Sequence, residues 1–491
     1  MARKMRDIGV AAGKVFHAEA QRGRGAEREM RDSGVDWIGK IPEGWEVART
    51  KRNYEIVLGK MLCSQQSEEN PIKAPYICAA NVHFDGVDTS DLKEMWFSSD
   101  ELALYAVNEG DLLVVEGGAG AGGAAICPKI SRLVGIQNSI LVARNRRCKD
   151  NRFLRYFVEV VVKHGYVDFV CNKATIPHFT KEKFGNMLIP FPPLPEQRAI
   201  AAYLDEKCGV IDAAVAEAKK GIEEYKAWKK SLIFEMVTGK RRVGAFNAET
   251  RCARDEVVGL PERSEPEGPQ GAARGGGAEK MKPSGIPWIG DIPEGWEVSR
   301  VKEVATIKTG NTPDKQYQNE YYSTDSGVPW IKAENLGFMV PISKTAEYLT
   351  EEGVKHGRIF PPRTVFVCCI ASIGKVGYSE KVASCNQQLN ALAFNSRMYW
   401  KYGFYVTIAA EEEYLVRASG NVVKILNSSE QGLIALPLPP LPEQQAIADY
   451  LDEKCAAIDA LVAEKEALIA DLEAYKKSLI YETVTGKREV A

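Results

Sequence analysis

The strongest constraint on the fold is an internal duplication, because three separated blocks of the sequence occur twice in the same order. The three pairs of blocks are WIGKIPEGWEV at 37–47 and WIGDIPEGWEV at 288–298, PPLPEQRAIAAYLDEKCGVID at 192–212 and PPLPEQQAIADYLDEKCAAID at 439–459, and KKSLIFEMVTGKR at 229–241 and KKSLIYETVTGKR at 476–488. Agreement over separated blocks predicts two tandem copies of one structural unit.

Between the repeated blocks the two copies diverge. The weak echoes that survive are PYICAAN at 75–81 against PWIKAEN at 329–335, and a glycine-rich stretch after an apolar run, at 117–123 in one copy and 371–375 in the other. Two copies that share a frame but differ in the surface between the shared blocks are typical of a protein that recognises two different targets with one scaffold.

The repeated blocks and the composition between them divide the chain into six segments. The stretch after residue 241 is rich in Gly, Pro, Glu and Arg and poor in apolar residues, which predicts a flexible linker, and the N-terminal residues have a similar character. The segments are a loose extension at 1–34, a first domain at 35–191, a long helix at 192–241, the linker at 242–283, a second domain at 284–438 and a second long helix at 439–491.

Each domain is predicted to be α+β. Short apolar runs, often β-branched and bounded by Gly, Asn or Pro, indicate strands, and longer stretches between them indicate helices. The predicted strands are 112–116, 140–143, 365–370 and 389–394, and the predicted helices are 152–162 and 398–411.

The segments that follow the two PPLPEQ blocks predict a pair of long helices. Proline often precedes a helix, and apolar residues then recur at alternating steps of four and three, as in a coiled coil. Gly239 and Gly486 stop the helices. Each helix is about 40 residues or roughly 60 Å long, and its apolar stripe needs a partner, for which the other copy is the obvious choice. The residues expected to pack there are Leu204, Ile211, Val215, Ile222, Leu451, Ile458, Val462 and Ile469.

Two glycine-containing stretches have the residue types of a phosphate-binding loop but not the order. The stretch 117–123 lacks the GxGxxG pattern of a dinucleotide site. Gly374 and Lys375 are followed by Val376 rather than by Ser or Thr, as a P-loop would require. We therefore expect no cofactor site in this chain.

The repeated Asp-Glu-Lys triplets at 205–207 and 452–454 have the residue types of a metal-dependent nuclease. Adjacent helix residues point about 100° apart, so the side chains cannot converge on one ion, and a solvated helix face is the expected structure. The five histidines are scattered without ligand spacing, and no amino-methyltransferase motif occurs. The chain is therefore predicted to be non-catalytic and to bind no metal.

Composition narrows the class of protein and its expected cellular compartment. Eleven cysteines without a CxxC pair fit the reduced thiols of a cytoplasmic protein, and no apolar run approaches the roughly 18 residues of a membrane span. A net charge of −2 argues against a generally basic nucleic-acid coat, but positive charge can be local.

Local positive charge does occur between residues 144 and 183, where 10 basic residues face 4 acidic ones. Such an excess suits phosphate binding, and a solvated helix face is the alternative. Amides and lysines near predicted loops can meet purine edges, and turn or capping chemistry is the alternative for each. The candidate base-reading residues are Asn81, Lys173, Thr175, His178, Lys332, Asn335, Ser372, Lys375, Asn386, Gln387 and Lys424.

Taken together, the duplicated WIG-IPEGWEV blocks, the duplicated PLPPLPEQ helix starts and the duplicated Lys-Lys-Ser-Leu-Ile…Thr-Gly-Lys helix ends resemble the specificity subunits of Type I restriction-modification systems over almost the whole chain. The second copy adds IKTGNTP at 307–313 and ASIGKVG at 371–377 to this resemblance. The first copy departs from it at 118–120, where Gly-Ala-Gly stands in place of the Ala-Ser-Ile-Gly-Lys loop.

The resemblance implies two α+β target-recognition domains separated by an antiparallel pair of long coiled-coil helices, a tandem pseudo-twofold repeat. Each domain would bind one half of a split, asymmetric site in double-stranded DNA, and the helices would set the distance between the halves. Two methyltransferase subunits would dock on the helices, and restriction-translocase subunits would join for cleavage. S-adenosylmethionine, ATP and Mg²⁺ are expected on those partners.

Two other classes of function remain open from the sequence. A Type II-like restriction-modification enzyme would fuse such recognition domains to a methylase, but the methylase motifs are missing. A non-catalytic interaction scaffold would use the same coiled coil without contacting DNA, and salt-dependent, sequence-selective DNA binding would separate it from a specificity subunit.

Overall fold

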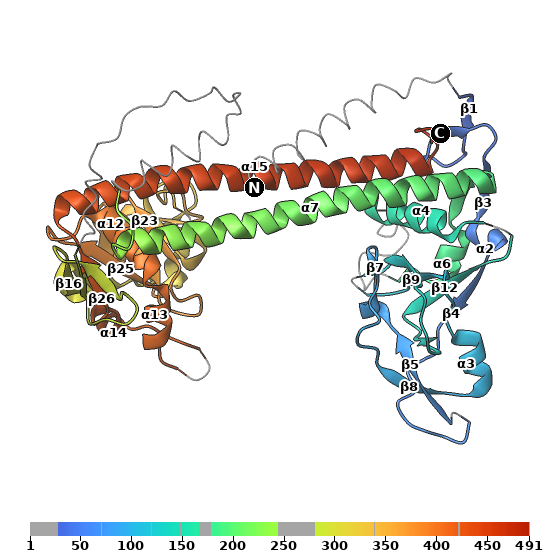
Figure 1. Ribbon diagram of the computed structural model, residues 1–491, viewed down its shortest axis with the longest axis horizontal. Coiled ribbons are helices and arrows are strands. Elements are labelled where there is room, and N and C mark those ends of the chain that lie inside the picture. Colours follow the sequence, from blue (N-terminus) through green and yellow to red (C-terminus); the bar gives the residue numbers. More distant parts are fainter. Residues whose placement is uncertain are drawn as a thin grey trace, which may run out of the picture. The chain divides into compact units, whose positions relative to one another are not determined.

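The computed structural model describes residues 28–490 except 70, 119, 148, 166–177, 244–279, 338 and 421–422 (Figure 1). Most of the expected extension at 1–34 and linker at 242–283 lies outside the described residues. The chain forms two compact units: the first unit runs to Lys219 and takes in the chain again from Ala467, and the second unit spans Lys220–Glu466.

The first unit is an α+β domain built on one antiparallel sheet and one mixed sheet. The four-stranded sheet has the order β10-β9-β12-β4 and the three-stranded sheet the order β11-β5-β8. The strands are β1 (Met30–Asp32), β2 (Lys40–Pro42), β3 (Glu46–Arg49), β4 (Tyr54–Leu58), β5 (Ile72–Ile77), β6 (Val82–His83), β7 (Gly86–Val87), β8 (Glu94–Phe97), β9 (Leu112–Val115), β10 (Ala124–Ile126), β11 (Gly135–Ile136), β12 (Ile140–Asn145) and β13 (Leu188–Phe191). The helices are α2 (Thr50–Asn53), η1 (Ala79–Asn81), α3 (Ser99–Tyr105), α4 (Asn151–Lys163) and α6 (Lys181–Asn186).

The second unit repeats this plan with a larger second sheet. Its four-stranded sheet, β17-β25-β22-β23, has the same order of equivalent strands as β4-β12-β9-β10, and its other main sheet has the order β18-β20-β19-β24-β21. The strands are β14 (Met281–Pro283), β15 (Asp291–Pro293), β16 (Glu297–Arg300), β17 (Ala305–Thr309), β18 (Tyr322–Ser323), β19 (Val328–Ile331), β20 (Tyr348–Leu349), β21 (Ile359–Phe360), β22 (Thr364–Cys368), β23 (Val376–Ser379), β24 (Ala383–Cys385), β25 (Leu389–Phe394) and β26 (Ala435–Leu438). The helices are α9 (Val301–Val304), η2 (Lys315–Tyr317), α10 (Gln318–Tyr321), η3 (Ala333–Asn335), α11 (Glu351–His356), α12 (Trp400–Ala409), α13 (Glu411–Arg417) and α14 (Ser428–Gly432).

The predicted strands are confirmed because both faces of the central strands are covered. In β9, Leu112 and Val114 pack into the core beneath α4, and Leu113 and Val115 pack into a second core on the other face. This alternation follows from the two-residue period of a strand. An entirely apolar run such as β9 is therefore what a sheet covered on both sides needs.

Two segment boundaries differ from the sequence prediction. The predicted helix 398–411 is interrupted at Ala410: α12 ends at Ala409 and α13 begins at Glu411. The expected loose extension and linker end in strands, since β1 pairs with β2 and β14 pairs with β15. These short antiparallel pairs tie the chain to each domain just before the repeated tryptophan block.

The predicted long helices are α7 (Leu194–Val237) and α15 (Leu441–Val484), each of 44 residues (Figure 1). Both begin two residues inside the predicted segments 192–241 and 439–491, at the Leu-Pro of the PPLPEQ block. Proline is tolerated in the first turn because its missing N–H has no helical partner there.

Segments of the two helices pack antiparallel within each unit. In the first unit, Lys476 Nζ lies 2.7 Å from both carboxylate oxygens of Asp212. In the second unit, the equivalent pair has exchanged helices, and Lys229 Nζ lies 2.6 and 2.7 Å from the oxygens of Asp459. Each domain is therefore mounted on the start of one long helix and the end of the other.

The residues expected to pack between the helices lie in the two main cores or against them, except Ile222, which is buried outside both clusters. Most are buried, and Ile469 and Val462 are partly buried at the edge of the first and second core respectively. The lysine that interrupts the stripe, Lys465, places its ammonium group 5.8 Å from the ring centre of Tyr225. The buried residues are Leu204, Ile211, Val215, Ile222, Leu451 and Ile458.

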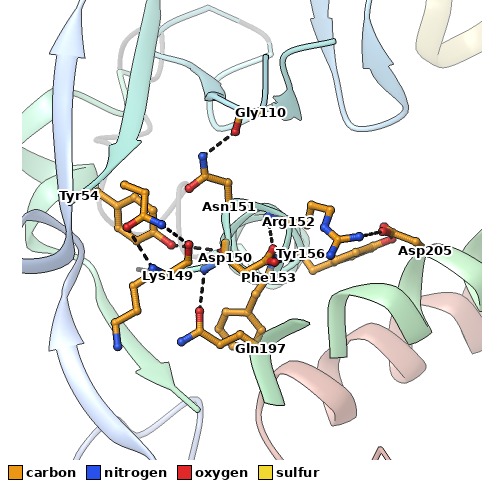
Figure 2. A network of polar contacts seen from close by, with 11 residues as sticks. Tyr54, Gly110, Lys149, Asp150, Asn151, Arg152, Phe153, Tyr156, Gln197 and Asp205 are labelled. Atoms are coloured by element: carbon orange, nitrogen blue, oxygen red, sulfur yellow. Dashed lines mark hydrogen bonds and ion pairs between the residues drawn. The ribbon is translucent and has the colours of Figure 1, made fainter. Parts of the chain in front are cut away.

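The start of α4 is joined to the start of α7 by a polar network (Figure 2). The fully buried Gln197 side chain accepts a hydrogen bond from the Asp150 backbone amide at 2.9 Å and donates to the Pro192 carbonyl at 2.7 Å. The second unit repeats this contact: Gln444 accepts from the Tyr399 amide at 2.7 Å. The glutamine of the PPLPEQ block therefore fixes the domain to its helix.

A second junction lies about two turns further along each long helix. Asp205 accepts hydrogen bonds from the Tyr156 hydroxyl at 2.8 Å and from Arg152 at 2.9 Å (Figure 2). Burial, followed by the nearby Cys208 and Asp205, raises the pKa of Tyr156, so this phenol remains a hydrogen-bond donor.

Asp452 plays the same part in the second unit. It accepts from the Tyr405 hydroxyl at 2.7 Å and pairs with Lys401. The prediction of a solvated face was incomplete for these two aspartates, whose side chains are 45% and 34% exposed but which each also hold a domain helix. It holds for Glu206 and Glu453, whose side chains are 72% and 73% exposed.

The end of each long helix docks on the tryptophan block of the other copy. Gly486 has φ +71°, and a Cβ there would lie 2.3 Å from Pro42; Gly239 has φ +73°, and a Cβ would lie 2.4 Å from Pro293. Only glycine allows both the left-handed backbone and this close approach. The two most strongly repeated blocks are therefore the two sides of one contact, made once in each unit.

Candidate nucleic-acid interface

In each unit, three loops are held together at the end of the four-stranded sheet, and we call them the rim. The first is the turn between β9 and β10, or between β22 and β23. It closes through Val115 N–H to Gly123 O at 2.8 Å in one unit and Cys368 N–H to Lys375 O at 2.8 Å in the other. Lys375 therefore occupies the position of Gly123, and the first turn is one residue longer.

The second loop of the rim precedes β12 or β25 and consists of residues 137–139 or 386–388. It is bonded to the first loop in the same way in both units, through Glu116 N–H to Ser139 O and Cys369 N–H to Gln388 O, both at 2.8 Å. The third loop reaches the rim through isolated β-bridges, Gly117 with His178 and Ile370 with Ile425. The backbone frame of the rim is thus common to the two units.

The side chains of the second rim are polar and accessible. Ser372, Lys375, Gln387 and Lys424 are exposed, and the Ala371 amide contacts the Lys424 carbonyl at 3.5 Å. The largely buried Asn386 shapes the second loop by donating to the Gln388 side chain at 3.1 Å. These five predicted residues are therefore brought together from three loops.

Lysine and amide side chains of this kind can bond to guanine O6 and N7 or to adenine N6 and N7 in the major groove. Beneath them, burial raises the pKa of the Cys369 thiol to about 12, with Cys368 adding to the shift, so Cys369 stays neutral. The charge of the second rim comes from its lysines.

The first rim has different chemistry on the same frame. His178 Nδ1 lies 3.1 Å from Glu116 Oε2, and its side chain is 56% exposed. The remaining polar groups are Gln137, Asn138 and Ser139, all half-buried, with the Ser139 hydroxyl donating to Gln137 at 2.9 Å. No lysine stands at the Gly123 position.

The glycine-rich stretch 117–123 is a hairpin turn between antiparallel strands. Gly118 and Gly122 have φ of +94° and +87° and allow the chain to reverse there. A dinucleotide loop instead joins a strand to the N-terminus of a helix. The strands on either side of this stretch are antiparallel, so its geometry is that of a hairpin turn and differs from that of a strand-to-helix dinucleotide loop.

Three predicted residues are engaged inside their own domains. Asn81 and Asn335 cap short 3₁₀ turns, where their Oδ1 atoms accept from the Cys78 amide at 3.0 Å and the Lys332 amide at 2.9 Å. Lys332 pairs with Glu347 and lies 4.9 Å from the Trp330 ring centre. The predicted Lys173 and Thr175 lie outside the described residues.

Several basic residues of the run at 144–183 have acceptors within their own domain, among the residues that the structure describes. Arg144 donates to the Ala106 carbonyl at 2.6 Å, and Arg155 and Lys163 both pair with the buried Glu159, at 3.1 and 2.5 Å. Arg152 is occupied by Asp205 at 2.9 Å. Several of these side chains therefore neutralise carboxylates or cap carbonyls within the domain, and phosphate binding by the run stays a prediction.

Sequence reasoning missed residues 137–139. Their signal is positional: like Asn386-Gln387-Gln388, they are three polar residues directly before an apolar strand, and the Gln137 and Asn386 amides bond to Ile77 O and Ile331 O at 2.9 and 3.1 Å. Among the residues that the structure describes, no group of three or more His, Cys, Asp or Glu side chains is arranged to hold a metal ion. No described helix is long and apolar enough to cross a membrane.

Comparison with protein families gives one match that covers most of both copies. Residues 42–214 and 293–470 each match the model described as the Type I restriction modification DNA specificity domain. The two matched regions begin in the tryptophan blocks and end within the long helices, so they follow the repeat itself.

Individual relatives agree with this match, one of them over nearly the whole chain. The chain is 26% identical over 469 residues to the Type I restriction enzyme MjaVIII specificity subunit of Methanocaldococcus jannaschii, covering 92% of this chain and 94% of that one. It is 24% identical over 206 residues to the Type I restriction enzyme EcoKI specificity subunit of Escherichia coli, covering 40% of this chain and 44% of that one. A chain solved in work on complex assembly and conformational transition of the type I R-M system superposes with a TM-score of 0.64 at 16% identity, covering 90% of this chain and 98% of that one. That likeness shows a shared fold.

Proposed function

Because the chain belongs to the Type I restriction modification DNA specificity domain family, we propose that it is the subunit that gives such a system its DNA sequence specificity. Each domain binds one half of a bipartite, asymmetric site in double-stranded DNA. The observation that carries this proposal is the pair of rims, which share their backbone hydrogen bonds and differ in almost every side chain that they expose.

Base recognition is assigned to the rims. In the second unit Ser372, Lys375, Asn386, Gln387 and Lys424 contact base edges, and Lys332 and Asn335 shape the adjoining turn. In the first unit His178 and the loop 137–139 do so, with Asn81 supporting that loop through the neighbouring contact of Ala79 N–H with Ser139 Oγ at 3.1 Å. Lys173 and Thr175 belong to the same proposed reading surface.

The long helices supply spacing and docking. Two methyltransferase subunits bind along them, and S-adenosylmethionine is held on those subunits, where an adenine is flipped out for methylation. Restriction-translocase subunits with ATP and Mg²⁺ complete the assembly. The chain itself is non-catalytic and works in the cytoplasm.

The non-catalytic role is supported by what the repeated aspartates do, since Asp205 and Asp452 hold tyrosine hydroxyls and cations of the domain helices. Purified alone and supplied with S-adenosylmethionine, ATP and Mg²⁺, the chain should neither methylate nor cut DNA. Robust activity from a preparation free of other subunits would overturn this part of the proposal.

A domain exchange tests whether each rim reads one half-site. Residues 35–191 are replaced by the matching domain of a relative, and methylated sites are mapped in the complete complex. One half of the site should change and the other should remain. Exchange of residues 284–438 is the matched control and should change the opposite half. A change of both halves in either chimera contradicts independent recognition. If the parent chain shows no salt-dependent, sequence-selective DNA binding, an interaction scaffold is favoured instead.

An insertion tests whether the helices set the distance between the halves. Four residues placed after Lys219 and four after Glu466 lie at the boundary of the two compact units and leave both cores intact. Four helical residues add about 6 Å, close to two base pairs at about 3.4 Å each. The mapped gap should lengthen by about two base pairs with unchanged half-sites. An unchanged gap in a folded, active complex would refute the ruler.

A further inference from the structure

The second unit contains a pocket at a position where the first unit is filled by one of its own side chains. It has a volume of about 470 Å³, in the range of ligand sites. Its floor is apolar, formed by Phe234 near the end of α7, Trp288 of the tryptophan block, and Ile408 and Ala409 at the end of α12.

The first unit shows what chemistry fills the equivalent space. The repeat relates Phe234 to Tyr481 and Trp288 to Trp37. Between these two rings lies the imidazole of His164, stacked on Tyr481 with ring centres 4.9 Å apart and lying 6.5 Å from Trp37. The space is therefore a slot for a flat nitrogen-containing group, and in the first unit the chain provides that group itself.

Substitutions between the copies open the slot in the second unit. The matched pairs Tyr156 with Tyr405 and Arg152 with Lys401 place Phe157, Val160 and His164 opposite Val406, Ala409 and Glu413. Each replacement removes bulk or the ring itself. Trp37 packs on Phe157 at 5.6 Å, a contact that Val406 cannot make with Trp288 in the same way.

The edge of this pocket is acidic. Glu412, Glu413 and Lys230 line it, and Lys230 is neutralised by the adjoining Glu411 at 3.0 Å. Lys240 Nζ lies 4.4 Å from the ring centre of Phe234, so this ring already accepts a cation on one face. Glu413 lies 3.9 Å from Arg417, and among the described residues no cation is within ion-pair distance of Glu412. An aromatic floor under a surplus of carboxylates attracts a planar cation, which stacks on the rings and pairs with the acids.

We propose that this pocket receives an arginine side chain of a methyltransferase subunit, so that the second unit offers an anchor that the first unit does not. This inference rests on the proposed function, because it takes a methyltransferase as the partner on the helices. The arginine guanidinium lies between Trp288 and Phe234, as His164 lies between Trp37 and Tyr481, and its charge faces Glu412 and Glu413. Two copies of the partner then bind with unequal affinity.

The test is titration of the full chain with purified cognate methyltransferase subunit, followed by sedimentation or calorimetry. Ala409→Phe fills the pocket and should weaken one of the two binding steps at least tenfold. The double change Glu412→Gln and Glu413→Gln leaves the pocket open and should weaken the same step severalfold, with a smaller dependence on salt. The matched control is Glu351→Gln, an exposed carboxylate on α11 outside the pocket, which should change nothing.

Each outcome decides a different claim. If the Ala409→Phe variant binds both methyltransferase subunits as tightly as the parent chain does, the pocket assignment is overturned. An equal loss of affinity at both binding steps overturns it as well. An effect of Ala409→Phe without any effect of the glutamine pair shows a neutral occupant and overturns the arginine. The glutamine pair alters one exposed and one half-buried carboxylate, neither in the core, so it remains informative if Ala409→Phe fails to fold. If the parent chain binds no methyltransferase at all, the proposed function fails first.

Discussion

The two units differ least where each domain meets the helices and most where each domain presents its rim. At the junctions the same residue types make the same bonds: Glu196 and Glu443 accept from the tryptophan indoles Trp45 and Trp296 at 3.2 and 3.0 Å. At the rims the backbone bonds match, yet Lys375 stands opposite a glycine. Repetition therefore marks the contacts that fix geometry, and divergence marks the surface free to change.

This division has a physical reason. A junction residue has several partners at once, so a replacement must satisfy a buried group, bear a charge and fit a fixed space. A rim side chain has one side in solvent, and its replacement costs little stability. Changes that strike the junctions should therefore have equal and large effects in the two units, and the following substitutions test that equality.

The largest effect is expected at the helix ends. Gly239→Ala and Gly486→Ala each place a Cβ within 2.4 Å of a proline ring at positive φ. The backbone strain of about 1–2 kcal/mol and the overlap of about 1–3 kcal/mol should together lower the unfolding free energy of the affected unit by about 3 kcal/mol.

Urea unfolding followed by the tryptophan fluorescence of each unit measures this loss. Gly285→Ala is the control, because Gly285 also has a positive φ of +75° but no atom lies within 4 Å of its Cβ position. Its loss should be limited to the backbone strain. A loss at Gly239 or Gly486 no greater than that of the control would show that the docking contact is absent in solution.

The next effect appears at high pH. Burial raises the pKa of the Cys208 and Cys455 thiols to about 11, although Lys476 and Lys229 oppose the shift. A folded pKa above the unfolded value of 9.0 contributes stability below pH 9 that is lost as the pH rises toward 11. At about 1.4 kcal/mol per unit, each thiol should account for roughly 2–3 kcal/mol of this loss.

Comparison of the parent chain with Cys208→Ala and Cys455→Ala isolates the thiols from other titrating groups. Each variant should show a shallower decline of unfolding free energy between pH 9 and 11, by a similar amount. A decline as steep as that of the parent chain in either variant would mean that its thiol is not buried in the helix seam.

Much of the fold could be predicted because the repeat fixes its topology before any residue is examined in detail. The run that became β9 is apolar throughout, and the run that became β25 is apolar except for Asn390, since both faces of their sheets are covered. Such runs stand out in a sequence. The end of α12 could not be predicted, because Ala410 is a good helix former and the break there depends on tertiary contacts.

The candidate site was predictable only in part. Ser372, Lys375 and Gln387 lie in polar segments next to predicted strands, so the sequence pattern predicts that they stand in exposed loops. Asn335 and Lys332 are also an amide and a lysine near a predicted loop. Only the fold reveals that Asn335 caps a turn and that Lys332 pairs with Glu347. Asp205 was misjudged for the opposite reason, since its partner Tyr156 lies 49 residues away.

A smaller effect is expected at the tyrosine–aspartate junctions. Tyr156→Phe and Tyr405→Phe remove a hydroxyl that donates to Asp205 or Asp452 at 2.8 or 2.7 Å. A hydrogen bond to a charged group contributes roughly 1.5–3 kcal/mol when buried, but both carboxylates are partly exposed. The expected loss is therefore about 1 kcal/mol in each unit, measured by urea unfolding.

Here the two units should differ slightly. Arg152 pairs with both Asp150 and Asp205, so its fork holds Asp205 after the hydroxyl is gone, whereas Lys401 offers only a point contact to Asp452. Tyr405→Phe should therefore cost a little more than Tyr156→Phe. The reverse order would contradict this account of the two junctions.

The smallest effect is expected in the turns of the rims, and its sign should reverse between the units. Gly118 and Ala371 occupy equivalent positions, with φ of +94° and +62°. Alanine in this left-handed region is strained by about 1–2 kcal/mol, and glycine gives back about 0.4–1 kcal/mol through its freer unfolded chain. Ala371→Gly should stabilise its turn by roughly 0.5–1 kcal/mol, and Gly118→Ala, whose Cβ meets no atom within 4 Å, should destabilise its turn equally.

Hydrogen exchange of the Gly374 and Gly122 amides, which close the two turns at 3.2 and 2.8 Å, gives a local measure. Protection should rise about threefold in one variant and fall about threefold in the other, since 1.4 kcal/mol is about tenfold. Changes of the same sign would show that the two turns do not share one backbone, and the equivalence of the rims would fail with them.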